Sequence, residues 1–435
     1  MLDDRTKQLT RPTVVDIFAG VGGLGLGFEQ AGFDVIGAVE IDPVHAATHS
    51  FNFPHCRTIC VDATKTCGEE VRRQLSTPID VVVGGAPCQG FSMIGKRALD
   101  DPRNQLVRHF LRLVIELAPS VFVFENVRGL TVGKHRQLLD ELTEELQEAG
   151  YSVTLPWQIL NARDYGVPQD RHRLFLLGSK GPRTPNYPML EILSPAPTCR
   201  DALDDLPNAE DFNELASSDS VRVEPQTAGL SHYAREMRCL GNDAWHNGYV
   251  REWDPQVMTA SRRTAHTDIS RRRFRNTRPA TVEPISRFYK LAGNGVSNTL
   301  RAGTDSARGA FTSPRPIHYR YDRCVTVREM ARLHGFPDWF RFHVTKWHGA
   351  RQIGNSVPPP LARAVAASVR DALAVSPTRP PDSIPLGAPE LLSMDMTEAA
   401  AYWGITVPIA KRDRKSGAKK RKQTDIERQR AAATT

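Results

Sequence analysis

The stretch Asp16-Ile-Phe-Ala-Gly-Val-Gly-Gly-Leu-Gly-Leu-Gly27 decides the fold, because it joins a predicted strand to a predicted helix through a run of glycines. Residues 13–18 predict a buried strand, and helical spacing follows as far as Gln30. Further strands are predicted at 35–40, 80–84, 121–124 and 174–178, with helices at 104–117 and 134–149. This alternation is typical of βαβ units and predicts an α/β fold with a mostly parallel sheet.

The glycines of this stretch also suggest chemistry. Gly20, Gly22 and Gly25 satisfy the G-x-G-x-x-G spacing, and Glu40 ends the next predicted strand. Glycines let a cofactor approach the backbone, and an acidic side chain accepts hydrogen bonds from ribose hydroxyls. The pattern is compatible with NAD, FAD or S-adenosylmethionine, and also with a turn that serves only packing.

The pattern changes after residue 181, where proline, arginine and irregular polar stretches dominate until about residue 321. We expect residues 1–180 and 351–376 to form a cofactor-binding domain. Residues 181–350 would form a smaller irregular or β-rich domain with a supporting helix at 325–334. A helix is predicted at 361–374, and the proline-rich, then basic, residues 377–435 predict a flexible tail.

Composition limits the class of protein. The 435 residues are 40% hydrophobic and 24% charged, which is typical of a globular protein with a full core. The sequence has no apolar run long enough to span a bilayer and no signal peptide, so we expect a cytoplasmic protein with reduced cysteines. The net charge of +8 suggests a polyanionic partner. Basic residues cluster at 262–290 and 411–422.

Cys88 follows the predicted strand 80–84 within Gly-Gly-Ala-Pro-Cys-Gln-Gly-Phe-Ser, residues 84–92. Parallel sheets usually place their chemistry in such loops, beyond the carboxyl ends of the strands. A thiol there can act as a nucleophile if its pKa is lowered. The alternative is a buried structural cysteine, which is common for an isolated one.

Two further segments place charged residues beside predicted strands. Glu125 directly follows the apolar strand 121–124, so we expect burial to raise its pKa, although it could simply cap the next helix. In Gln169-Asp-Arg-His-Arg173, alternation sends Arg171 and Arg173 to one face and His172 to the other. Paired guanidinium groups suit a phosphate or a base carbonyl, and a surface salt-bridge cluster is the alternative.

Taken in order, these segments resemble the DNA (cytosine-5) methyltransferase family, of the bacterial restriction-modification type. The resemblance runs from the glycine loop through Pro87-Cys88-Gln89, Glu125-Asn126-Val127 and 169–173 to 325–340 and Gly354-Asn355-Ser356-Val357. It covers most of residues 13–180 and 323–375. It implies a Rossmann-like S-adenosylmethionine-dependent domain, a target-recognition domain at 182–321, and duplex DNA as the partner.

The resemblance also implies roles for individual residues. Cys88 would add to carbon 6 of a flipped-out cytosine, Glu125 would bond the base, and Arg171 and Arg173 would hold its carbonyl and order the Cys88 loop. Asp62-Ala63 departs slightly from the usual acidic-then-aliphatic pair of the family. The cofactor would be bound by Phe18, Ala19, Gly20, Gly22, Gly23, Leu24, Glu40, Ile41, Asp62, Pro87, Asn355 and Val357. DNA would be contacted by Gln89, Ser92, Arg262, Arg263, Arg271, Arg272, Arg273 and Arg275.

Several alternatives stay open at this point. An RNA cytosine-5 methyltransferase would use the same motifs, and an NAD- or FAD-linked oxidoreductase would use the glycine loop and Glu40. A noncatalytic DNA-binding module is the third alternative. We expect no metal, because the spacing of His49, His55, Cys56, Cys60 and Cys67 matches no common zinc site. We also expect a monomer, functionally paired with a restriction endonuclease without stable binding.

Overall fold

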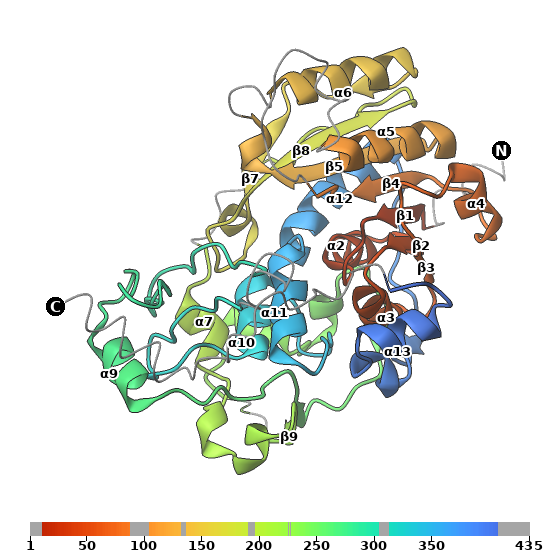
Figure 1. Cartoon of the computed structure of the whole chain (residues 1–435). Helices are drawn as coiled ribbons and strands as arrows, with labels where there is room; N and C mark the ends of the chain where they lie inside the picture. Colours follow the sequence, from red (N-terminus) through yellow and green to blue (C-terminus); the bar gives the residue numbers. More distant parts are fainter. Residues whose placement is uncertain are drawn as a thin grey trace, which may run out of the picture.

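A computed structural model describes residues 11–87, 104–131, 136–189, 196–224, 226, 228–303 and 313–407. Its centre is an eight-stranded sheet in the order β3-β2-β1-β4-β5-β8-β6, with β7 also paired to β8 (Figure 1). The strands are β1 (Thr13–Ile17), β2 (Asp34–Glu40), β3 (Arg57–Cys60), β4 (Val81–Gly84), β5 (Val121–Val127), β6 (Ser152–Val153), β7 (Gln158–Asn161) and β8 (His172–Ser179). The predicted α/β fold is confirmed.

The direction of the strands follows from their connections. Strands β3, β2, β1, β4 and β5 run parallel. Strand β8 runs antiparallel to β5, and β6 and β7 run antiparallel to β8. A parallel pair needs a long crossover, which the helices between these strands provide, whereas the segment 158–179 can return directly as an antiparallel pair. The parallel strands therefore end at one edge of the sheet, where ligand sites of such folds lie.

Helices cover both faces of the sheet, because its central strands are buried on both sides. On one face lie α4 (Gly68–Arg73), α5 (Gln105–Leu117) and α6 (Arg136–Glu148), which share a core with Val15, Val82 and Phe122. On the other face lie α2 (Gly23–Gln30) and α12 (Pro359–Leu373), which pack against Val14, Val81 and Val123. The helix α3 (Pro43–Asn52) follows β2 and begins beside the same edge of the sheet.

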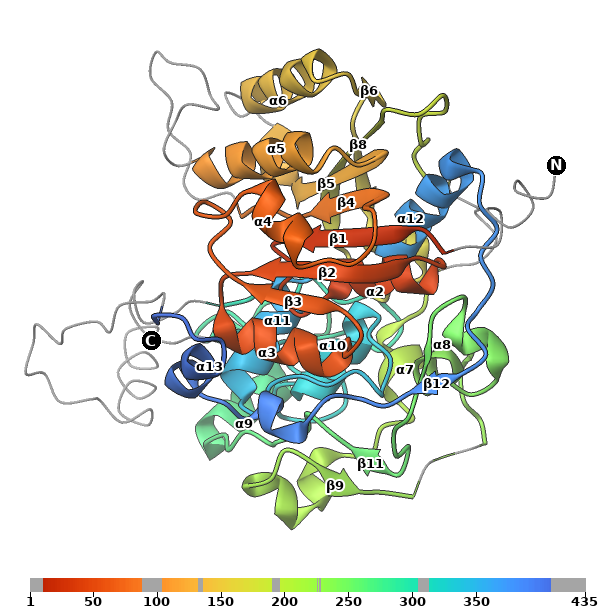
Figure 2. The same ribbon diagram turned by 90° about the vertical axis from the view of Figure 1, so that its right-hand side faces the viewer.

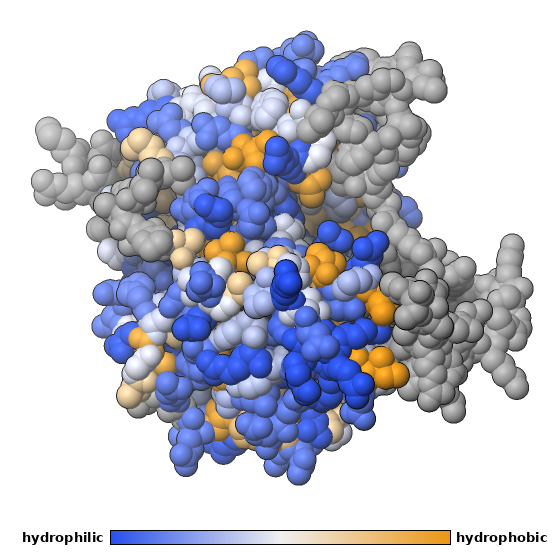
Figure 3. Space-filling model, turned by 90° about the vertical axis from the view of Figure 1, so that its left-hand side faces the viewer, coloured by the Kyte–Doolittle hydropathy of each residue, from blue (hydrophilic) through white to orange (hydrophobic). Residues whose placement is uncertain are grey.

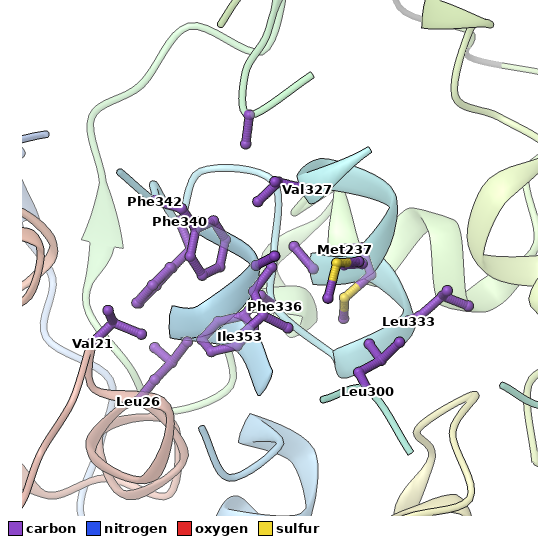
Figure 4. Close-up of a cluster of buried hydrophobic side chains, with 14 of the residues drawn as sticks. Val21, Leu26, Met237, Leu300, Val327, Leu333, Phe336, Phe340, Phe342 and Ile353 are labelled. Carbon is purple, nitrogen blue, oxygen red and sulfur yellow. The ribbon is translucent and has the colours of Figure 1, made fainter. Parts of the chain in front are cut away.

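The lower part of the molecule is irregular, as predicted, and consists of short elements (Figure 1). Its helices are α7 (Cys199–Leu203), α8 (His232–Met237), α9 (Asp268–Asn276), α10 (Val327–His334) and α11 (Lys346–Asn355). Its strands are two residues long: β9 (Val221–Arg222), β10 (Val250–Arg251) and β11 (Val257–Met258). One apolar cluster joins this region to the sheet region, because Val21 and Leu26 pack with Met237, Leu333 and Phe336 (Figure 4).

The C-terminal segment differs from its prediction. We expected a flexible tail from residue 377, but residues 377–407 pack along the molecule from α12 to α3 (Figure 2). The strand β12 (Ser383–Ile384) pairs with β10, and α13 (Met396–Tyr402) follows the short helix Pro389–Leu392. Leu391 and Leu392 bury their side chains against Ala47 and Phe51 of α3. The apolar pairs Leu391-Leu392 and Tyr402-Trp403 could have indicated that this segment packs. The prediction missed them because it relied on the average composition of residues 377–435. Residues 408–435 lie outside the described part of the chain.

The surface agrees with the polar composition. The face in Figure 3 is dominated by hydrophilic side chains, with apolar ones only in small separate patches. No helix within the described ranges is long and apolar enough to cross a membrane.

Candidate active site

The predicted catalytic and cofactor-binding residues that the structure describes gather at the carboxyl edge of the parallel strands. The loop 18–22 follows β1, Glu40 ends β2, residues 85–87 follow β4, and Glu125 lies near the end of β5. Because these strands run parallel and are neighbours, their ends necessarily meet. The topology thus brings the glycine loop, the start of the Cys88 loop and Glu125 to one place.

Of Gly20, Gly22, Gly23 and Gly27, only Gly20 borders open space. A Cβ added to Gly20, whose φ is +57°, would meet nothing within 4 Å. At Gly22 it would lie 2.4 Å from the Phe53 ring, and at Gly23 2.5 Å from the carbonyl oxygen of Val357. At Gly27 it would lie 2.3 Å from Ala362 in α12. The packing interpretation therefore holds for Gly22, Gly23 and Gly27, whereas Gly20 borders free space.

The backbone just before Gly20 is strained at Phe18. Phe18 has φ of +64°, in the left-handed region that a bulky residue rarely adopts. Its amide and that of Ala19 both donate to the carbonyl oxygen of Val39, at 2.9 and 3.1 Å. Such strain persists where the surrounding structure imposes it, and it is frequent at ligand sites.

Glu40 holds this loop against the end of β2. Its Oε2 accepts a hydrogen bond of 2.7 Å from the amide of Gly20, and its Oε1 accepts one of 2.8 Å from the amide of Asp42. Burial raises the pKa of the Glu40 carboxyl, while His45 and these amides oppose the rise. The next side chain, Ile41, is 41% exposed, which is unusual for isoleucine and offers an apolar surface beside the carboxylate.

Glu125 and Arg173 form a nearly buried ion pair. Arg173 Nε lies 2.9 Å from Glu125 Oε1, and the two side chains are 12% and 11% exposed. Residue 125 pairs with Phe175 across β5 and β8, so Arg173 lies two residues along on the same face, within reach of the carboxylate. As predicted, burial raises the pKa of Glu125, and Arg173 and then Arg171 counteract the rise.

The start of the Cys88 loop lies directly beside Glu125. Asn126 Nδ2 donates a hydrogen bond of 2.9 Å to the carbonyl oxygen of Ala86. A Cβ on Gly85 would lie 2.6 Å from Glu125 Oε2, so only glycine lets the loop pass this close. Pro87 follows and is exposed. Cys88, Gln89 and Ser92 lie outside the described residues.

The structure places Arg171 differently from its predicted role. Its Nη1 donates to the carbonyl oxygen of Leu300 at 3.0 Å, and its Nη2 donates to those of Gly354 and Ser356 at 2.9 and 2.8 Å. The side chain is buried, at 1% exposed. Its terminal nitrogens therefore hold three backbone carbonyls, and Arg173 is the member of the pair that borders Glu125. His172 faces the surface beside Asp170, as alternation predicted.

The remaining predicted cofactor residues surround the glycine loop or the ends of the neighbouring strands. Asn355 is exposed at the end of α11, and the carbonyl of Val357 packs on Gly23. Ala19 and Leu24 are buried beneath the loop. Asp62 lies just beyond β3, half-buried, and its Oδ1 accepts a hydrogen bond of 2.9 Å from the amide of Thr64.

Three of the six arginines predicted to contact DNA have acidic partners. On α9, Arg271 pairs with Glu210, Arg273 with Glu283 at 3.4 Å and Arg275 with Asp322 at 2.7 Å. Arg272 is exposed on the same helix, and Arg262 and Arg263 are half-buried. The contacts of α9 with its acidic neighbours depend on the tertiary structure, so the sequence cluster gave no sign of them.

Sequence reasoning assigned no role to three residues that organise the site. These are Asn126, which fixes Ala86, and Gln169 and His334, which bind one another through Nε2 and Nδ1 at 2.9 Å. The sequence could have pointed to Asn126 and Gln169, because they lie inside the Glu-Asn-Val and Gln-Asp-Arg-His-Arg segments. Among the described residues, no group of three or more His, Cys, Asp or Glu side chains could hold a metal ion.

Comparison with known proteins agrees with this geometry. Residues 12–371 match the family model of the C-5 cytosine-specific DNA methylase. The Type II methyltransferase M.XorII of Xanthomonas oryzae pv. oryzae is 55% identical over 93% of this chain and 96% of its own length. The Type II methyltransferase M1.HphI of Haemophilus parahaemolyticus is 32% identical over 82% of this chain and 86% of its own.

A solved structure described as a prophage-encoded DNA modification methyltransferase from E. coli superposes with a TM-score of 0.70. It is 33% identical, and the match covers 83% of this chain and 99% of that one. The family match excludes the oxidoreductase alternative, because the family model covers both the glycine loop and the Glu125 region. The chain belongs to the C-5 cytosine-specific DNA methylase family.

Proposed function

We propose that this enzyme transfers the methyl group of S-adenosylmethionine to carbon 5 of a cytosine in a specific duplex DNA sequence. The single observation that supports this most is the meeting of Glu125, Arg173 and Ala86 beside the open glycine loop. Cys88 lies two residues beyond Ala86 in the sequence. A nucleophile, a base-binding carboxyl and a cofactor loop are the parts this reaction needs.

The residues present fit S-adenosylmethionine. The space at Gly20 admits a ligand, the Glu40 carboxylate suits ribose hydroxyls, and the exposed Ile41 side chain suits an aromatic base. Asp62 would accept from the adenine amine, while Asn355 and Val357 would border the loop from the other side. When bound, the cofactor supplies an electrophilic methyl group on sulfur.

The residues of the chain would carry the remaining chemistry. A free thiol has a pKa of about 8.5, so the Cys88 nucleophile needs local positive charge, which Arg173 would supply. Addition of the thiolate to carbon 6 makes carbon 5 electron-rich, and Glu125 would bond ring nitrogen 3 and the exocyclic amine during this step. Its raised pKa favours sharing a proton with nitrogen 3. Carbon 5 would then take the methyl group, leaving S-adenosylhomocysteine, and loss of the carbon 5 proton to water with elimination of the Cys88 thiolate from carbon 6 would restore the ring.

The substrate base must leave the duplex to reach this site. Extrusion of a stacked base costs a few kcal/mol, and basic surfaces of the irregular region would hold the flanking phosphates. The sequence identity to Type II methyltransferases supports a functional pairing with a restriction endonuclease. The two enzymes would recognise the same DNA sequence. We infer that the enzyme acts in the cytoplasm as a monomer.

The test is methyl transfer from labelled S-adenosylmethionine to duplex DNA and, in parallel, to tRNA. We expect transfer to DNA, and bisulfite sequencing of DNA from expressing cells would identify the target cytosine. Cys88→Ala should abolish transfer while S-adenosylmethionine still binds. Full activity of that variant would overturn the covalent mechanism, and transfer to tRNA alone would establish the RNA alternative.

A further inference from the structure

Two segments far apart in sequence are joined backbone to backbone behind the site. The first is residues 297–302 of the irregular region, which we call the recognition segment because it lies in the part of the chain expected to recognise DNA. The second is the closing segment, residues 354–357, whose Val357 packs on the glycine loop. A Cβ on Gly354 would lie 2.3 Å from the amide nitrogen of Ala302, so the two backbones touch.

The recognition segment is also bound to the residues before β8. The amide of Asp170 donates to the carbonyl oxygen of Ser297 at 2.7 Å, and the amide of Ser297 donates to that of Pro168 at 2.8 Å. Thr299 Oγ1 donates to the carbonyl oxygen of Asp170 at 2.7 Å. These bonds give the segment a fixed position although it belongs to no helix or long strand.

Three buried side chains fill the junction of these segments. Arg171 bonds Leu300 in the recognition segment and Gly354 and Ser356 in the closing segment. Gln169 accepts from the amide of Leu300 at 3.0 Å through Oε1 and approaches His334 Nδ1 at 2.9 Å through Nε2. His334 Nε2 lies 3.0 Å from the carbonyl oxygen of Ser356.

The ring of His334 is therefore held in one tautomer. The Gln169 amide nitrogen can only donate, so Nδ1 accepts, and Nε2 carries the proton that it donates to Ser356. Burial lowers the pKa of His334 well below its usual range, and Arg171 and Arg173 lower it further, so the ring stays neutral. The ring also stacks on Phe336, with centroids 5.7 Å apart. The chain Leu300–Gln169–His334–Ser356 is continuous and fully buried.

We propose that His334 is a positioning residue that couples DNA recognition to cofactor retention through this chain of hydrogen bonds. A duplex that fixes the recognition segment would fix Leu300, and through Gln169 and His334 it would fix the carbonyl of Ser356. The next residue, Val357, would then keep its contact with Gly23 in the cofactor loop. This proposal rests on the proposed function, because it takes residues 355–357 as a wall of the cofactor site.

The experiment measures how much specific DNA tightens cofactor binding. The probe is S-adenosylhomocysteine, which cannot react, titrated by calorimetry with and without the duplex that bisulfite sequencing identifies. In the native enzyme we expect the duplex to increase the affinity of the probe. In His334→Phe, which keeps the ring and its stacking, we expect this increase to fall roughly five- to tenfold, the worth of about one net hydrogen bond. Affinity without DNA should change less than twofold.

A second variant and a control separate positioning from general damage. His334→Gln offers an acceptor to Gln169 and a donor to Ser356, so it should restore at least half of the lost coupling. His318→Phe removes an equally buried imidazole elsewhere in the irregular region and should leave the coupling unchanged. If His334→Phe does not fold, the comparison of His334→Gln with His334→Met decides in the same way.

Three results would overturn the proposal. The first is a native enzyme whose cofactor affinity does not respond to the duplex. The second is unchanged coupling in His334→Phe, and the third is an equal loss of affinity with and without DNA. Each of these leaves methyl transfer by the native enzyme intact, whereas failure of the proposed function would remove that transfer itself.

Discussion

Arg173 Nε lies 2.9 Å from Glu125 Oε1, and both side chains are almost completely withdrawn from solvent at the end of the sheet. A buried carboxylate is costly unless it is paired, and here the Arg173 guanidinium pairs with it. Under the proposed function, this pair would be a preorganised site in which a substrate base lies beside a charge that is already desolvated.

The first prediction concerns Glu125→Gln. The amide keeps the shape and an acceptor for Arg173 but removes its counter-charge, so the free energy of unfolding should fall by about 1–3 kcal/mol. Turnover should fall about 100-fold or more, because the amide cannot share a proton with ring nitrogen 3. Steady-state kinetics and DNA binding measure the two effects. The exposed Glu144→Gln serves as control. Equal losses in turnover and DNA affinity would indicate a structural role instead.

Gly85→Ala tests the close approach of the Cys88 loop to Glu125. The added methyl would lie 2.6 Å from Glu125 Oε2, and the carboxylate would move away from Arg173 to relieve it. We expect a loss of kcat of at least tenfold with a small change in Tm, since the clash falls on a side-chain end. Gly181→Ala is the matched control, because a Cβ there meets nothing within 4 Å. An active Gly85→Ala enzyme would contradict the geometry.

Glu40→Ala should weaken binding of S-adenosylhomocysteine by at least tenfold, because it removes the acceptor that orders Gly20 and would meet the ribose. Calorimetric titration without DNA measures this directly. Removal of an exposed carboxylate on α4, in Glu69→Ala, should leave the affinity unchanged. Native-like affinity of Glu40→Ala would move the cofactor site elsewhere.

The C-terminal segment should contribute to stability. Leu391 and Leu392 are 5% and 3% exposed against α3, so each change to alanine should cost about 2–4 kcal/mol in denaturant unfolding. Leu155→Ala, at a side chain that is 53% exposed, should cost less than about 0.5 kcal/mol. Because α3 begins at Pro43, whose carbonyl accepts from Trp403 Nε1, the two core variants should also weaken cofactor binding. Unchanged stability in both would show that the segment is dispensable.

Mild acid should destabilise the fold through buried histidines. Burial lowers the pKa of His49 to about 3 and that of His318 to about 4, so the folded protein leaves both neutral while the unfolded chain protonates them. Since the folded-state pKa is depressed for a base, stability is complete above about pH 6.5 and declines below it, by up to about 1.4 kcal/mol per pH unit for each group.

Urea unfolding between pH 7.5 and 5.5 tests this decline. His49→Phe should reduce the slope, because one of these protonations is lost. The same change at His172, which lies at the surface, should not. A slope that His49→Phe leaves unaltered would assign the acid sensitivity to other groups.

Local sequence was sufficient for the elements that form the cofactor side. The predicted strands 13–18, 35–40, 80–84 and 121–124 correspond to β1, β2, β4 and β5, and the helices before Pro119 and after Pro358 correspond to α5 and α12. Apolar runs and glycine or proline boundaries are local signals, so these elements could be recognised without knowledge of their neighbours. The short strands β3, β6 and β7 and the packed segment 377–407 carry weaker patterns and were missed.

The sequence by itself determined the order of the motifs, the parallel core and the type of each site residue. Strand alternation makes Arg171 and Arg173 equivalent. The tertiary structure distinguishes them, because Arg171 is buried and bonds backbone carbonyls while Arg173 borders Glu125. The reason is that the carbonyls of Leu300, Gly354 and Ser356, more than a hundred residues away, take the donors of one guanidinium and leave the other to the carboxylate. Long-range packing determines which of the two guanidinium groups is left to pair with Glu125, so local spacing cannot predict it.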